Sequence, residues 1–85
     1  MPEISRFYGI VITINFNEHL PPHFHARYGE FRASIRFDGE VLEGRLPSRA
    51  LRLVRVWAMQ HRGELEMDWT LARALQPLVP IAPLD

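Results

Sequence analysis

The order of the expected elements predicts an α+β fold, because strand patterns fill the first half of the chain and helix patterns follow them. β-branched and aromatic residues alternate with polar ones up to Leu46. Glycine-containing turns divide this region, and apolar residues recur at helical spacing after Pro47. We expect one domain, a four-stranded antiparallel meander with two C-terminal helices packed on one face. The predicted strands are 8–16, 23–28, 31–37 and 40–46, the helices are 47–62 and 64–76, and residues 77–85 form an extended tail.

Two short turns predict the register of the last three strands. The residue pairs 29–30 and 38–39 suit two-residue hairpins, because glycine supplies the positive φ that such turns require. The register then follows from turn geometry alone, and alternation assigns every side chain to a face. The pairs expected on the inner face are Tyr28 with Phe31, Ala26 with Ala33, Ala33 with Gly44 and Ile35 with Leu42.

The remaining elements are predicted from their apolar positions. Pro47 is tolerated in the first turn of a helix, and Gly63 weakens the helix and separates it from the next. Prolines at 77, 80 and 83 repeat once per turn of polyproline II, and we expect the tail to pack across the core. In the first strand, Ile10, Ile12, Ile14 and Phe16 share one face. The apolar stripes of the helices are Ala50, Leu53, Val54 and Trp57 in the first and Leu65, Trp69 and Ala72 in the second.

The composition limits the class of protein. The chain has 85 residues, a formal net charge of +0 and no cysteine, so we expect no disulfide and no thiol chemistry. No apolar run approaches the length of a membrane span, and the N-terminal residues lack the pattern of a signal peptide. We therefore expect a cytoplasmic protein that does not contact a membrane, while the oligomeric state stays open.

Arginine residues dominate the predicted outer face of the sheet. All ten basic residues are arginine, and the register places Arg27, Arg32 and Arg45 in one cross-strand row. Like charges directly opposite each other destabilise a sheet by a few tenths of a kcal/mol up to about 1 kcal/mol. Glu43 and Glu30 are the nearest acids, and otherwise an anion such as phosphate would compensate the charge. The predicted anion-binding residues are Arg27, Arg32, Arg36 and Arg45, unless the side chains simply spread into solvent.

Three of the four histidines lie between positions 19 and 25. In a strand, His23 and His25 point to the same side. Metal-free cleavage of RNA needs a base, an acid and cations for the phosphate, so we name His23, His25 and Glu43 as candidate catalytic residues. The alternative is that both histidines are structural and form hydrogen bonds with the prolyl loop.

The same histidines also resemble a weak metal-binding pattern. His23 and His25 would lie about 7 Å apart at Cα, and His19 could approach from the loop to complete a three-histidine zinc site. The positive charges of Arg27 and Arg36 oppose a bound cation. We therefore expect no metal and no cofactor.

Four blocks of the sequence resemble a known family. They are residues 1–9, the block Pro21-Pro22-His23-Phe24-His25 with residues 26–30, residues 46–51 and residues 69–73. These blocks are similar to the small bacterial domain-of-unknown-function family DUF4160. The resemblance implies a protein encoded beside a second small protein, and some members are labelled toxins of type II toxin-antitoxin modules. The family has no established catalytic residues, so the roles given to His23 and His25 come from the residues themselves.

These observations lead to two functional hypotheses. The first is a toxin-like component of a type II toxin-antitoxin module that binds a small neighbour-encoded partner and acts on RNA or on translation. The second is a non-enzymatic adaptor or binding module whose basic face recognises an acidic protein or a nucleic acid. Whether the chain is an enzyme stays open at this point.

Overall fold

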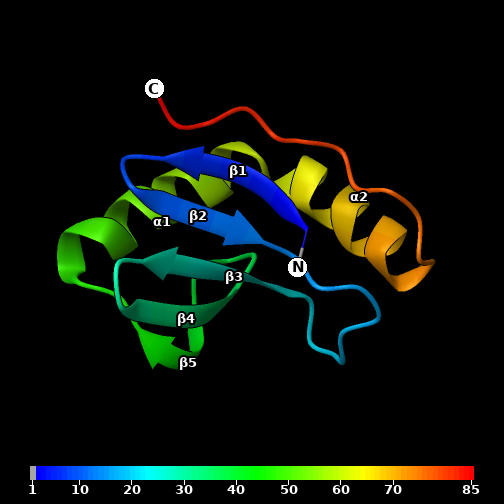
Figure 1. The fold of residues 1–85 in the computed structure, drawn as a ribbon, viewed down its shortest axis with the longest axis horizontal. Coiled ribbons are helices and arrows are strands. Elements are labelled where there is room, and N and C mark those ends of the chain that lie inside the picture. The colour runs from blue at the N-terminus through cyan, green and yellow to red at the C-terminus, as the bar shows by residue number, and fades with distance from the viewer. Residues whose placement is uncertain (1) are drawn as a thin grey trace.

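The computed structural model describes residues 2–85 and contains one antiparallel sheet with two helices on one of its faces (Figure 1). The strands follow one another in the sheet in the order β1-β2-β3-β4-β5. The predicted α+β class is confirmed, but the sheet has five strands and not four. The elements are β1 (Glu3–Phe7), β2 (Ile10–Thr13), β3 (His23–Tyr28), β4 (Phe31–Arg36), β5 (Val41–Arg45), α1 (Ser48–Gln60) and α2 (Arg62–Arg73).

The additional strand arises because the predicted strand 8–16 is in fact the second half of a hairpin. Tyr8 and Gly9 adopt positive φ angles of 49° and 79°, as the two central residues of a type I′ turn do. Residues 3–7 therefore fold back on residues 10–13 and form β1. The prediction for Phe16 was also wrong, because β2 ends at Thr13 and leaves Phe16 in the following loop, 45% exposed.

The hairpin between β4 and β5 closes differently from the predicted two-residue turn. The backbone N–H of Arg36 donates to the carbonyl oxygen of Glu40 at 2.8 Å, so the loop holds three residues, and Val41 lies opposite Ile35. Leu42, which the two-residue turn placed on the inner face, is 39% exposed. An irregularity opposite Ser34 and Ile35 absorbs the extra residue. The predicted pairs nearer the other end of the strands are confirmed, namely Arg32 with Arg45, Ala33 with Gly44 and Ser34 with Glu43.

The core lies between the inner face of the sheet and the two helices. The ring of Trp57 in α1 is fully buried, and its centroid lies 5.4 Å from that of Phe7 and 5.8 Å from that of Phe24. Trp69 in α2 approaches Phe37 edge-on at 6.3 Å. Truncating an aromatic side chain in such a core costs about 3–5 kcal/mol. The sheet is therefore fixed on the helices through one face, and among residues 2–85 the other face carries no helix (Figure 1).

The two helices meet at His61, two residues before the predicted break at Gly63. His61 follows α1 and precedes α2, with φ −121°, and its Nδ1 lies 2.6 Å from Oε1 of Glu64. Gly63 is accommodated inside the first turn of α2. The second helix ends at Arg73, three residues earlier than predicted, because Leu75 adopts a left-handed φ of 59°. Within residues 2–85, neither helix has the length and apolar character needed to cross a membrane.

The proline-spaced tail runs beside β1 and over the helices (Figure 1). The N–H of Ile81 donates to the carbonyl oxygen of Ile4 at 2.7 Å, and Ile81 is buried in the core. Nε1 of Trp57 donates to the carbonyl oxygen of Ala82, and Oδ1 of Asp68 accepts from the N–H of Val79 at 2.8 Å. These bonds hold the tail along an edge of the sheet that would otherwise be open.

Gly44 tests the close approach of β5 to β4. Its φ is +76°, and an added Cβ would clash with the backbone oxygen of Arg32 on the neighbouring strand. We expect Gly44→Ala to lower the free energy of unfolding by more than about 2 kcal/mol in urea denaturation. Gly63→Ala is the control, since within residues 2–85 nothing outside its own helical turn lies within 4 Å of the added Cβ, and it should be neutral or stabilising by up to about 1 kcal/mol. Equal stabilities for the two variants would contradict this close approach.

Asp68 should make the stability of the fold dependent on pH. Burial and the nearby charge of Glu64 raise the pKa of this carboxyl above its ordinary value of 3.8, against the opposing hydrogen bond from Val79. The folded chain therefore keeps the proton at pH values where the unfolded chain has lost it, and stability falls as the pH rises through the folded pKa. Asp68→Asn keeps an acceptor for Val79 and removes the charge.

We expect Asp68→Asn to raise the melting temperature at pH 7 relative to the wild type, and this gain should shrink toward pH 4. Asp68→Ala removes the acceptor for Val79 as well, so it should be less stable than Asp68→Asn at each pH. Thermal unfolding followed by circular dichroism measures both effects. A difference between wild type and Asp68→Asn that is the same at pH 4 and pH 7 would contradict the assignment.

Candidate functional site

Two rows of cross-strand neighbours cover the outer face of the sheet. The first row contains the predicted neighbours Arg27, Arg32 and Arg45, and the register extends it through Val11 to Arg6. The second row runs beside the first on the same face, two residues away along β2, β3, β4 and β5. It consists of Glu3, Thr13, His25, Ser34 and Glu43. We call Arg27, Arg32 and Arg45 of the first row the arginine row, which leaves out Arg6 because Arg6 pairs with Glu3 at 2.8 Å.

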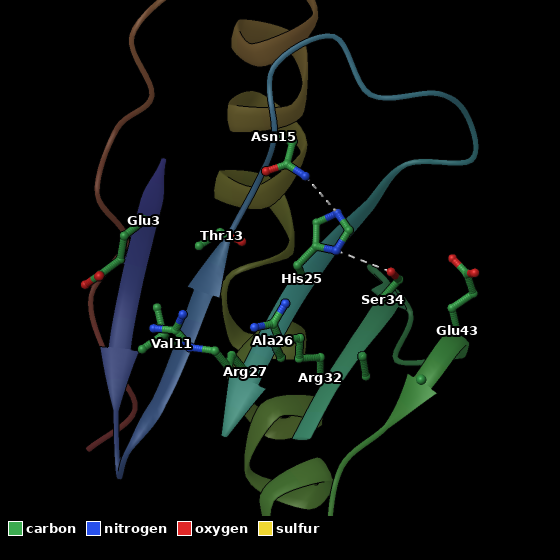
Figure 2. A pocket seen from close by; sticks show the side chains of 12 residues that line it. Glu3, Val11, Thr13, Asn15, His25, Ala26, Arg27, Arg32, Ser34 and Glu43 are labelled. Atoms are coloured by element: carbon green, nitrogen blue, oxygen red, sulfur yellow. Dashed lines mark hydrogen bonds between the residues drawn. The ribbon is translucent and has the colours of Figure 1, made fainter. Parts of the chain in front are cut away.

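A groove of about 530 Å³ lies over these two rows (Figure 2). Val11 and Thr13 form part of its floor, and each is only 9% exposed although it lies on the outer face. The side chain of Val11 makes this part of the floor apolar. Arg27 and Arg32 flank one side of the groove, and His25 lies at the end where β2 leaves the sheet. The lining residues are Glu3, Val11, Thr13, Asn15, His25, Ala26, Arg27, Arg32, Ala33, Ser34, Glu43 and Gly44.

Within residues 2–85, the predicted anion-binding arginines differ in whether a carboxylate already neutralises them. Arg27, Arg32 and Arg45 form no ion pair, although the guanidinium of Arg45 lies 5.2 Å from the ring centroid of Phe31. Arg36 is different, because it pairs with Asp38 at 3.2 Å and with Glu40 at 3.3 Å. The positive charge that remains available to an anion therefore belongs to the arginine row.

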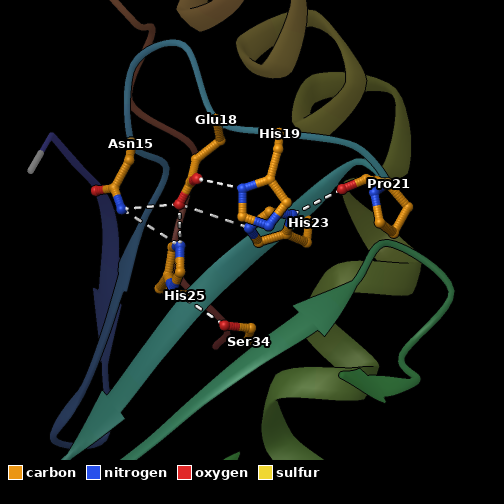
Figure 3. Close-up of polar contacts among 7 residues, drawn as sticks. All are labelled: Asn15, Glu18, His19, Pro21, His23, His25 and Ser34. Carbon is orange, nitrogen blue, oxygen red and sulfur yellow. Dashed lines mark hydrogen bonds and ion pairs between the residues drawn. The ribbon is translucent and has the colours of Figure 1, made fainter. Parts of the chain in front are cut away.

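The loop between β2 and β3 brings a carboxylate onto the histidines (Figure 3). Oε1 of Glu18 lies 3.0 Å from Nε2 of His25 and 3.7 Å from Nε2 of His23. Nδ2 of Asn15 donates to the same oxygen at 3.1 Å, and Nδ1 of the exposed His19 lies 3.4 Å from Oε2. Glu18 therefore joins four side chains from the loop and from β3. We call Glu18, His23 and His25 the Glu18 cluster.

Hydrogen bonds on the far sides of the rings orient both histidines of the Glu18 cluster. Nδ1 of His23 lies 2.7 Å from the carbonyl oxygen of Pro21, which can only accept, so Nδ1 carries the hydrogen and donates. Nδ1 of His25 lies 3.3 Å from Oγ of Ser34. The hydrogen bond from His23 to the prolyl loop is the one that the structural interpretation of this residue predicts, and the ring is 4% exposed.

The surroundings of Glu18 favour its charged form. Burial by itself would raise the pKa of this carboxyl, but hydrogen bonds from His25 and Asn15 and the charges of His23 and His25 outweigh burial. The net result is a pKa below the ordinary value of 4.5. The cluster therefore holds a carboxylate at neutral pH at one end of the groove.

The structure brings together some of the predicted site residues and separates others. The rings of His23 and His25 lie 5.1 Å apart between centroids, as their alternation in the strand implies. Glu43 lines the groove from β5, whereas the carboxylate that touches the histidines belongs to Glu18. Sequence reasoning missed Glu18. The available signal was that Glu18 is the only acid between Glu3 and Glu30 and directly precedes the histidine segment.

Comparison with known proteins adds a family to this geometry. A family described as a domain of unknown function (DUF4160) matches residues 9–70. The matched segment includes the loop, the Glu18 cluster and the arginine row from Arg27 to Arg45. No curated protein and no solved structure matches the chain.

Glu18 should stabilise the loop that carries it. We expect Glu18→Gln to lower the free energy of unfolding by about 1–3 kcal/mol, because hydrogen bonds to a charged acceptor are lost or weakened. His19→Gln is the matched control, since the His19 side chain is 85% exposed, and its effect should stay within about 0.5 kcal/mol. Urea denaturation at pH 7 measures both variants. If Glu18→Gln is as stable as His19→Gln, the cluster does not hold the loop.

Proposed function

The chain belongs to the DUF4160 family, and we propose from its outer face that it binds RNA through the phosphate backbone and acts on it as a toxin-like component of a type II toxin-antitoxin module. The observation that carries this proposal is the arginine row beside the groove. Arg27, Arg32 and Arg45 have no carboxylate partner within residues 2–85 and line up across three strands. A guanidinium group matches the geometry of a phosphate, and the polyanion would relieve the repulsion along the row.

The chemistry in this proposal belongs to the end of the groove where His25 meets Glu18. His25 lines the groove and lies two residues from Arg27 along β3, a separation of about 7 Å between Cα atoms. A phosphate held by Arg27 would therefore lie next to the imidazole. The acid and base roles suggested for His23, His25 and Glu43 stay proposals, with His25 the one nearest the proposed phosphate and buried His23 acting on it through Glu18.

A non-enzymatic binding module is the second candidate. It is favoured by the fact that two of the predicted functional residues are engaged in internal contacts. His23 is buried and bonded to Pro21, and Arg36 pairs with Asp38 and Glu40. In either case, a small neighbour-encoded protein is the expected partner and the cytoplasm is the expected location.

RNA binding tests the arginine row directly. For a single-stranded RNA, the logarithm of the binding constant falls with the logarithm of salt concentration by about 0.7 per phosphate contact. We expect the double variant Arg27→Gln with Arg32→Gln to bind more weakly and to reduce this slope by about 1.4. Fluorescence anisotropy with a labelled RNA between about 50 and 200 mM salt measures the slope.

Arg62→Gln is the matched control, because Arg62 lies in α2 and pairs with Glu66 at 3.2 Å. Its slope should equal that of the wild type. Equal slopes for all three proteins would contradict the proposed contact of Arg27 and Arg32 with the RNA backbone. Expression in a bacterial host separates the two candidates. Growth arrest that is relieved both by His25→Ala and by the double arginine variant supports the toxin, whereas harmless expression with intact RNA binding supports the binding module.

A further inference from the structure

We propose that the Glu18 cluster is a binding site for one divalent first-row transition-metal ion, of which Zn²⁺ is the representative. Glu18, His23 and His25 each offer one ligand atom, and these atoms all lie within 4.8 Å of one another. This site goes beyond RNA binding by the arginine row and does not depend on it. Two imidazoles and one carboxylate are ligands that suit zinc and its neighbours rather than magnesium or calcium.

The distances in the cluster are close to those of a metal centre. Bonds of 2.0–2.2 Å to a tetrahedral ion place neighbouring ligand atoms about 3.3 Å apart. Oε1 of Glu18 lies 3.0 Å from Nε2 of His25 and 3.7 Å from Nε2 of His23, on either side of that value. The third pair, formed by the ligand nitrogens of His23 and His25, lies within 4.8 Å, so the two rings would move closer together around an ion.

The orientation of the His23 ring suits a metal ligand. Its Nδ1–H donates to the carbonyl oxygen of Pro21, so Nε2 is the ring nitrogen that could bind an ion. That nitrogen lies within a buried ring and is 3.7 Å from Oε1 of Glu18, which is beyond hydrogen-bond distance. A backbone carbonyl on the far nitrogen is the usual way in which proteins orient a metal-binding histidine. Nε2 of His23 and Oε1 of Glu18 therefore face each other without a hydrogen bond, as two ligands of one ion would.

Two side chains outside the proposed ligand set hold the ligands in place. Nδ2 of Asn15 donates to Oε1 of Glu18 at 3.1 Å, while its Oδ1 points away from the cluster (Figure 3). Oγ of Ser34 lies 3.3 Å from Nδ1 of His25 and would act as the outer support of that ligand.

The electrostatic objection to a cation is weaker in the structure than it is in the sequence. Asp38 and Glu40 neutralise Arg36, so Arg27 is the one of these two arginines whose charge still opposes a cation. A bound ion would decide between acid–base and metal-assisted chemistry at this end of the groove, because His25 cannot bind an ion through Nε2 and transfer a proton through the same atom.

Titration of the full chain with Zn²⁺ after treatment with a chelator tests the site. We expect one ion per chain by calorimetry, a visible absorption spectrum of low-symmetry Co²⁺ when that ion is used, and a rise in melting temperature with Zn²⁺ but not with Mg²⁺. Glu18→Gln and His25→Gln should each weaken Zn²⁺ binding by at least about 100-fold. Ser34→Ala should weaken it by about tenfold or more, as removal of an outer support does.

His61→Gln is the matched control, because His61 and Glu64 form another histidine–glutamate pair, with Nδ1 and Oε1 2.6 Å apart. This variant should keep full affinity, as should the double arginine variant, which separates the metal site from RNA binding. Circular dichroism confirms that each variant is folded. The proposal is overturned if the wild type does not bind Zn²⁺, or if folded Glu18→Gln and His25→Gln bind it as tightly as His61→Gln.

Discussion

The packing of Trp57 against Phe7 and Phe24 is the contact on which the other features of the structure depend. It joins α1 to β1 and β3 and determines which face of the sheet is buried. Since side chains alternate in a strand, every residue whose neighbour packs on this tryptophan points to the opposite face. The burial of Phe24 in this way gives His23 and His25 a common side, and the burial of Ala26 does the same for Arg27.

The outer face combines a row of like charges with a loop that carries the opposite charge. Arginines placed side by side repel one another, and solvent or an anion must compensate them. Glu18 does not neutralise the row, because it is held by Asn15 and His25 at the end of the groove. The face therefore presents cationic groups next to an oriented carboxylate and the partly exposed imidazole of His25, with buried His23 behind them, and this separation of charge underlies both proposals.

The register of β5 shows how far turn chemistry predicts a structure. The Asp38-Gly39 turn indicated a hairpin at the correct place, but the loop holds one residue more than a two-residue turn. The bulge near Leu42 then shifts the pairing back, so that Arg32 still lies opposite Arg45. The predicted arginine row is thus correct because two departures cancel. Gly44 lies beyond the bulge, opposite Ala33, and has the left-handed φ that glycine adopts most readily.

By itself the sequence determined the α+β class, the antiparallel pairing of β3 with β4 and the shared side of His23 and His25. These features follow from local rules, namely alternation along a strand and the conformations that glycine permits in a turn. Only the tertiary structure decided that Glu18 contacts the histidines and that Arg36 forms ion pairs with Asp38 and Glu40. It also decided that the tail packs along β1. A loop or tail has no periodicity, and its position depends on contacts between residues far apart in the chain, which no local pattern encodes.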